Sequence, residues 1–182
     1  MIFGNPAVFA ILIEYLPIWS ENSYKNGMFH FCIDGFFFPD QVCVSCLGVD
    51  VFELLSEDHP FVSFPENKGL FEGEKSNSFE IMLRMAYPGM FEEDIPDDFS
   101  ASHLYRASTQ ILEDAGYFVF AVTYGDMVRV LGTKMTELKR DEVSGRNVWH
   151  KIDTPDIKEV FLNKSEVSEM IKEVNEFKLK LW

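Results

Sequence analysis

Apolar runs that end at turn-forming residues divide the first third of the chain into predicted strands. Residues 7–17 (AVFAILIEYLP) are rich in aliphatic side chains and end at Pro17, which is typical of a buried strand. Residues 28–33 alternate between two faces and predict a second strand. The Asp34-Gly35 pair follows at once, and such a pair between apolar runs favours a hairpin with a type I′ turn.

The pattern then changes from strand to helix. Residues 42–47 predict a third strand. Asp50, with Glu53 three residues later, matches a capping box and predicts that a short helix opens there. The polar stretch 57–76 contains glycine and proline and is expected to be a loop.

A second helix is predicted from a second capping box, formed by Asn77 and Glu80. Its apolar residues recur at helical spacing until Pro88 stops the run. These residues are Phe79, Met82, Leu83, Ala86 and Tyr87.

The second half of the chain predicts another hairpin. Residues 117–124 and 127–131 flank Gly125-Asp126, where glycine suits the first position of a type II′ turn. Residues 148–152 and 160–162 predict further strands.

The last element is a predicted amphipathic helix capped by Asn163 with Glu166 as its partner. Its apolar stripe is Val167, Met170, Ile171, Val174 and Phe177. Hairpins with a few helices predict the α+β class, with an antiparallel sheet and helices packed against it. The length of 182 residues and the 18 phenylalanines fit a single globular domain over residues 1–182.

Charge narrows the range of partners. The chain carries 30 acidic and 16 basic residues, a net charge of −14, which argues against binding to nucleic acid or to an anionic membrane. Residues 40–100 hold 14 acidic and 3 basic residues, so this third of the chain contributes −11. Concentrated negative charge favours a basic protein partner, although charge can also serve solubility alone.

The densest acidic cluster is the predicted partner-binding site. It comprises Glu92, Glu93, Asp94, Asp97 and Asp98. The cluster lacks the ligand spacing of a calcium loop, and calcium binding or a merely solvated loop are the alternatives to a protein-binding patch.

Motifs for catalysis and cofactors are missing from the sequence. Cys43 and Cys46 form a single C-x-x-C without the second pair that a zinc site needs, so buried free cysteines are favoured over metal or redox use. The four histidines match no metal spacing, and His30 alternates with apolar neighbours like a core or edge residue. No G-x-S-x-G, P-loop or G-x-G-x-x-G is present. We therefore expect no catalytic residues, no metal and no cofactor.

Three cysteines do not form a disulfide framework, which suits a reducing cytoplasm. The apolar stretch 9–13 meets Glu14 and is too short for a signal peptide or a membrane span. The expected location is the cytoplasm.

Short motifs spread along the chain resemble the immunity protein 42 family of bacterial polymorphic toxin systems. They are Met1 to Pro6 leading into Phe9 to Ile11, Lys25 to Phe29, Ile33 to Gly35, Gly116-Tyr117 and Tyr124 to Asp126. The resemblance implies an α+β protein that binds and neutralises a cognate toxin by direct contact, with no catalytic residues. A nuclease toxin would suit the acidic charge, because its active site must be basic to hold phosphates.

Two other functions stay open from the residues alone. One is a small enzyme whose site is assembled from dispersed residues, and the other is an acidic protein-interaction adaptor without a toxin partner. Trp19 and Trp149 are candidate apolar anchors for a partner, with ordinary core packing as the favoured alternative.

Overall fold

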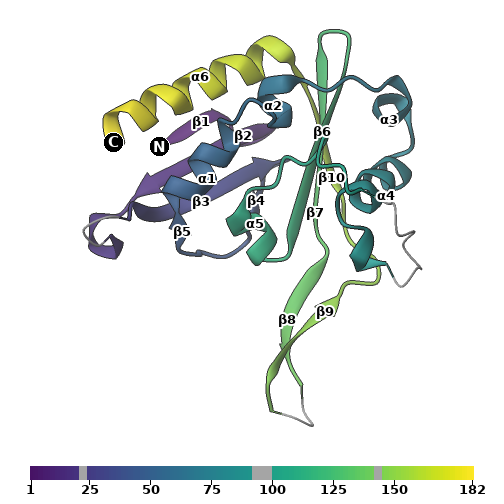
Figure 1. Cartoon of the computed structure of the whole chain (residues 1–182), viewed down its shortest axis with the longest axis horizontal. Helices are drawn as coiled ribbons and strands as arrows, with labels where there is room; N and C mark the ends of the chain where they lie inside the picture. The colour runs from purple at the N-terminus through teal and green to yellow at the C-terminus, as the bar shows by residue number, and fades with distance from the viewer. Residues whose placement is uncertain (21–23, 92–99, 142–144) are drawn as a thin grey trace.

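The structure is a computed structural model that describes residues 1–20, 24–91, 100–141 and 145–182 (Figure 1). Its strands are β1 (Ile2–Asn5), β2 (Phe9–Tyr15), β3 (Asn26–Ile33), β4 (Phe36–Phe38), β5 (Ser45–Cys46), β6 (Tyr117–Tyr124), β7 (Met127–Lys134), β8 (Thr136–Arg140), β9 (Asn147–Lys151) and β10 (Lys158–Asn163). Its helices are η1 (Pro17–Trp19), α1 (Leu47–Leu54), α2 (Pro60–Ser63), α3 (Lys68–Glu72), α4 (Lys75–Ala86), η2 (Pro88–Met90), α5 (Gln110–Asp114) and α6 (Lys164–Leu181). The predicted α+β class is confirmed, but the described strands form three antiparallel sheets instead of one.

The first sheet has the order β1-β2-β3-β4, and β5 also pairs with β3. Its β3–β4 turn confirms the predicted hairpin, because Asp34 and Gly35 have φ values of 52° and 79°. A type I′ turn needs positive φ at both positions, which asparagine, aspartate and glycine tolerate best.

In the second sheet, with the order β10-β7-β6, strands β6 and β7 are buried on both of their faces. Along β6, Val119 and Ala121 belong to one hydrophobic cluster, whereas Phe118 and Phe120 belong to a second one. The predicted β6–β7 hairpin is confirmed, and Gly125 has the positive φ, 57°, that the first position of a II′ turn requires.

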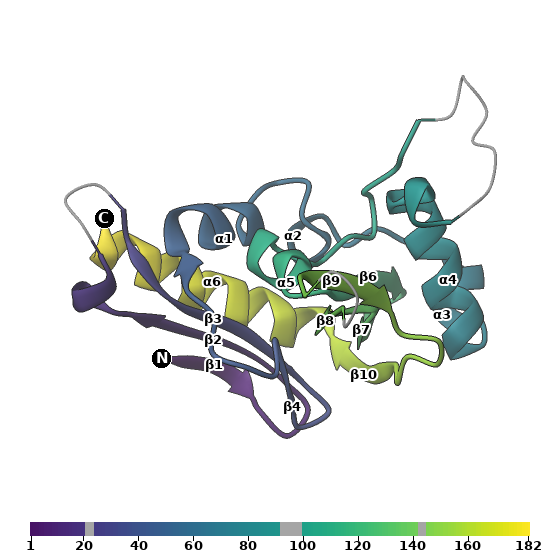
Figure 2. The ribbon, with the colours of Figure 1, turned by 90° about the horizontal axis from the view of Figure 1, so that it is seen from below.

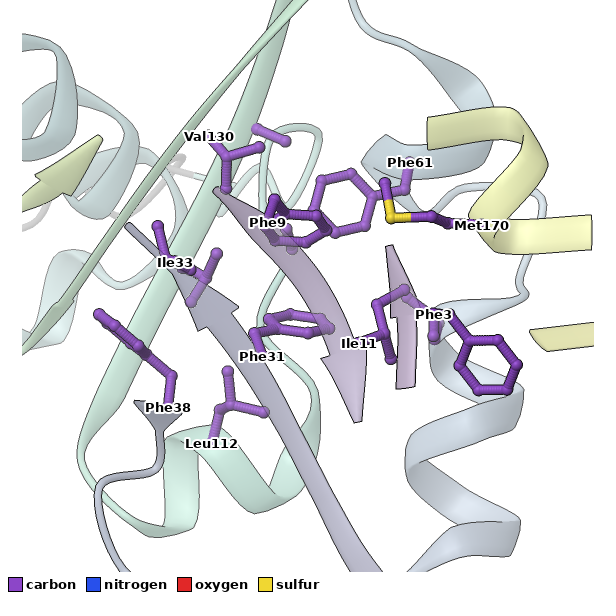
Figure 3. Packing of buried hydrophobic residues seen from close by; sticks show 14 of the residues in the cluster. Phe3, Phe9, Ile11, Phe31, Ile33, Phe38, Phe61, Leu112, Val130 and Met170 are labelled. Atoms are coloured by element: carbon purple, nitrogen blue, oxygen red, sulfur yellow. The ribbon is translucent and has the colours of Figure 1, made fainter. Parts of the chain in front are cut away.

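The first cluster lies between the first sheet, the second sheet and the helices α1, α2 and α6 (Figure 2). Figure 3 shows aromatic rings from three elements meeting at its centre. The ring of Phe9 lies 5.6 Å from that of Phe31 and 5.2 Å from that of Phe61. Tilted and edge-on contacts of this kind add to the stabilisation from burial.

The second cluster lies between β6, β7 and the helices α3 and α4. Phe79 of α4 packs edge-on against Phe120 of β6 at 5.2 Å. Arg129 of β7 is 2% exposed, donates to the carbonyl oxygens of Leu70, Phe71 and Gly73, and pairs with Glu159. A buried guanidinium needs this many partners, so Arg129 fixes the α3–α4 connection to the sheet.

Two predicted helix starts are wrong. Helix α1 begins at Leu47, and Asp50 lies inside it with 2% of its surface exposed. Helix α4 begins at Lys75, because the Glu74 carboxylate accepts the Asn77 backbone N–H at 2.9 Å and caps the helix first. The apolar residues predicted to face the core are nevertheless buried in α4, namely Phe79, Met82, Leu83 and Ala86.

The predicted third strand and loop also differ from the structure. Only Ser45–Cys46 of the expected strand 42–47 pairs with β3. The expected loop 57–76 contains α2 and α3, which His59 and Asn67 cap with their side chains.

The predicted C-terminal helix is confirmed as α6. The Glu166 carboxylate accepts the Asn163 backbone N–H at 2.7 Å, which stabilises the first turn. Val174 is fully buried, and the Phe177 ring lies 5.9 Å from that of Phe3. A Cβ at Gly4 would lie 2.4 Å from the Met170 sulfur, so glycine permits the close approach of α6 to β1.

The strands predicted at 148–152 and 160–162 correspond to β9 and β10. Strands β8 and β9 form a two-stranded ribbon that projects away from the two larger sheets (Figure 1). Among the described helices, none combines the length and apolar character that crossing a bilayer requires.

Candidate functional site

A network of partly buried charges ties three of the described helices together. Arg106 pairs with Glu53 at 2.8 Å, and its guanidinium and the Tyr87 hydroxyl both donate to Glu113. Burial and the Glu113 carboxylate raise the pKa of Tyr87 well above its ordinary value. These groups hold α1, α4 and α5 to one another, which is a structural task.

Asp50, which was expected to cap α1, caps a different helix. One of its carboxylate oxygens accepts the Ser45 hydroxyl at 2.6 Å, and the other accepts the Ile111 backbone N–H at 2.9 Å. Glu53 accepts the N–H of the neighbouring Gln110 at 2.9 Å. Two carboxylates of α1 therefore satisfy the free N–H groups at the start of α5.

The described histidines and cysteines do not gather into a ligand cluster. His30 is buried and its Nδ1 lies 3.0 Å from the Pro39 carbonyl, which confirms the interpretation as a core residue. Burial raises the pKa of the Cys43 thiol, and the nearby Asp40 carboxylate adds to the shift, so the thiol is less reactive than a free one. Within the described ranges, no three ligand-type side chains gather where they could hold a metal ion.

The described acidic residues of the middle third are partly neutralised by basic residues. Nine of its 14 acidic residues are described, and five of these form ion pairs. Three of the pairing cations lie outside residues 40–100, in Arg106, Lys134 and Lys164. The five residues of the predicted partner-binding cluster, Glu92, Glu93, Asp94, Asp97 and Asp98, lie outside the described residues.

Trp149 lies on the surface, so the favoured expectation of core packing is wrong for this residue. It is 50% exposed on β9, directly opposite Leu138 of β8, which is 52% exposed. A groove of about 430 Å³ at the base of the ribbon is lined by both side chains and by Lys134 and Asp114, among others. Trp19, the other candidate anchor, is half-buried in η1.

A second exposed feature runs along α6 where the helix faces β1 and the β1–β2 turn. Two grooves of about 370 Å³ and 250 Å³ lie there, and Glu173 lines both of them. The helix contributes four exposed glutamates to their rim, spaced three or four residues apart. They are Glu166, Glu169, Glu173 and Glu176.

The opposite wall and floor of these grooves are apolar. Ile2, Val8 and Phe161 are 54%, 37% and 48% exposed and line them. Sequence reasoning missed this feature, because only the apolar stripe of the helix was considered. The recurrence of glutamate at positions 166, 169, 173 and 176 was a readable signal that these side chains share one face.

Among the described residues, the Thr109 hydroxyl is buried without a hydrogen-bond partner, whereas the buried charged groups Asp50 and Arg129 are engaged in holding the fold. The exposed ribbon and the grooves offer surfaces for recognition. This defines a small α+β protein of the binding class. Across residues 1–177 the chain matches the sequence model described as immunity protein 42, and it belongs to that family. It is thus an immunity protein, and its partner is a cognate toxin, as the resemblance in its sequence predicted.

In fold, the chain is similar to the crystal structure of CdiI from Burkholderia dolosa AUO158. The TM-score is 0.71 at 23% sequence identity, and the match covers 97% of this chain and 99% of that chain. At this identity the likeness establishes the fold. A comparison with curated protein sequences finds no significant match.

Proposed function

We propose that this protein neutralises its toxin by direct contact in the cytoplasm and without catalysis. The observation that carries the proposal is the match to the immunity protein family over residues 1–177. The use of Asp50, Glu53 and Arg129 as structural ties supports it, since these groups are engaged in holding the fold. The free cysteines are compatible with a reducing compartment.

The partner that best fits the charge is a basic toxin, such as a nuclease domain. A protein of net charge −14 attracts a basic surface over distances set by the ionic strength. Glu92, Glu93, Asp94, Asp97 and Asp98 are the proposed contact residues, on the strength of their sequence density alone. Charges at the rim of an interface act mainly on the rate of encounter.

The experiment pairs this protein with its cognate toxin domain. Co-expression should protect cells from the toxin, and the purified proteins should form a complex in size-exclusion chromatography. Neutralising the five residues of the 92–98 cluster to Gln or Asn should slow association at low salt. Added salt should slow the wild type in the same way.

Three results would count against the proposal. If co-expression does not protect cells and the two proteins form no complex, direct neutralisation is refuted. If the association rate of the complex does not change with salt concentration, the proposed role of the acidic residues in association is refuted. If the purified immunity protein alone converts a substrate to product, the protein is an enzyme and the proposal of neutralisation without catalysis is refuted.

A further inference from the structure

The grooves between α6 and β1 combine two properties that together select one kind of ligand. Their floor is apolar and open to solvent, with Val8 and Phe161 exposed, and one rim is a row of carboxylates from α6. An apolar floor attracts aliphatic or aromatic groups. A carboxylate rim attracts cations, and only lysine and arginine carry both features on one side chain.

Three of the four rim carboxylates are available to a partner, whereas Glu166 is engaged in the cap of α6. Glu173 and Glu176 are exposed and form no ion pair with any residue that the structure describes. Glu169 pairs only with Lys172, at 3.3 Å and with both side chains more than 60% exposed, a geometry that contributes little stability. The smaller groove also has two cationic groups among its lining residues, Lys180 and the N-terminal ammonium of Met1, and the ammonium is already paired with Glu14 at 2.8 Å.

The projecting ribbon β8–β9 is the alternative contact surface, and its mixed charge is less selective for a basic partner. Lys139 and Lys151 lie there beside Glu137, so the ribbon presents both signs. In Figure 1 the ribbon points away from α6, so mutations on the two surfaces can be compared as separate sites.

We propose that the α6–β1 grooves seat a lysine- or arginine-bearing segment of the cognate toxin, a step that rests on the proposed function. The aliphatic stems of the basic side chains lie over Val8 and Phe161. Their charged ends reach Glu169, Glu173 and Glu176. Paired charges in this setting contribute both to the rate of encounter and to the lifetime of the complex.

The test measures the Kd of the toxin domain for the full-length immunity protein and for matched variants. Glu173→Gln with Glu176→Gln should weaken binding about tenfold, because two partly desolvated ion pairs are lost. The control is Glu57→Gln with Asp58→Asn, which removes the same charge from two exposed residues outside both grooves. The control should change Kd by less than about threefold.

A second variant tests the floor of the groove. Val8→Lys places a fixed cation and a longer side chain among the glutamates, and it should weaken binding more than the double glutamate variant does. The backbone bonds of Val8 to Asn5 and Asp34 do not involve its side chain, so the turn should persist. Thermal unfolding of each variant should match that of the wild type.

Equal weakening by the groove pair and the control pair would show that only net charge matters, and it would overturn the proposal. Unchanged binding of both groove variants would also overturn it, and a large loss with Trp149→Ala would then assign the contact to the ribbon. Failure of the wild type itself to bind the toxin would instead refute the proposed function.

Discussion

His59 should make the stability of this protein fall as the pH drops from neutral towards 5. The imidazole is 5% exposed, and burial lowers its pKa to about 4. Its Nδ1 accepts the Phe61 backbone N–H at 3.2 Å, while Nε2 lies 3.3 Å from the Ala107 carbonyl and donates to it. Protonation of Nδ1 would place its N–H opposite the Phe61 backbone N–H, so the hydrogen bond that caps α2 would be lost.

The size of the effect follows from the two pKa values. In the unfolded chain a histidine has a pKa of about 6.5, so between pH 6.5 and 4 the unfolded state binds a proton that the folded state does not. The stability is therefore fully present above pH 6.5 and is lost as the pH falls. The loss should reach about 2 kcal/mol at pH 5 and about 3 kcal/mol at pH 4.

The assay is urea unfolding of the wild type and of His59→Asn from pH 7 down to pH 5. Asparagine can still cap the helix through its side-chain oxygen but does not titrate. The variant should be less stable at pH 7, and its disadvantage should shrink by about 2 kcal/mol at pH 5. A constant difference across this range, or an NMR titration that places the pKa of His59 near 6.5, would refute the reasoning.

Three further outcomes are expected. Arg129→Met should lower the free energy of unfolding by about 3 to 5 kcal/mol in denaturant unfolding, because Glu159 and three carbonyl oxygens lose a buried partner. The control, Lys139→Met on the exposed ribbon, should change it by less than about 0.5 kcal/mol. Phe177→Ala should lower the free energy of unfolding by about 2 kcal/mol, since its ring is only partly buried. Leu179→Ala, at a position 72% exposed, should leave the free energy of unfolding unchanged. Equal effects of the two substitutions would show that the α6 stripe does not pack as described. A strong chelator should leave the midpoint of thermal unfolding unchanged, and a fall of many degrees would reveal a structural metal.

The features that were predicted correctly depend on neighbours in sequence. The turns at Asp34-Gly35 and Gly125 and the cap of α6 at Asn163 are local solutions to backbone strain and unpaired N–H groups, so a few residues suffice to specify them. The short helices α2 and α3 were missed, because four or five residues carry no measurable periodicity.

The features that were missed depend on residues far apart in the chain. Asp50 satisfied the local pattern of a helix cap, but the backbone N–H that it accepts belongs to Ile111, 61 residues later. The negative charge of residues 40–100 suggested a single patch, yet Glu53 and Glu66 pair with Arg106 and Lys164. Local patterns do not reveal such partners, because the fold that brings them together is itself the unknown.

The burial of β6 and β7 on both of their faces has a consequence for how the molecule unfolds. Neighbouring residues of β6 belong to different clusters, so neither cluster can lose its packing while the strand remains intact for the other. Hydrogen exchange should report a single slow event shared by the amides of β6 and β7, with the ribbon β8–β9 exchanging earlier. Recognition surfaces at the periphery can thus change in sequence while one shared strand pair keeps the interior cooperative.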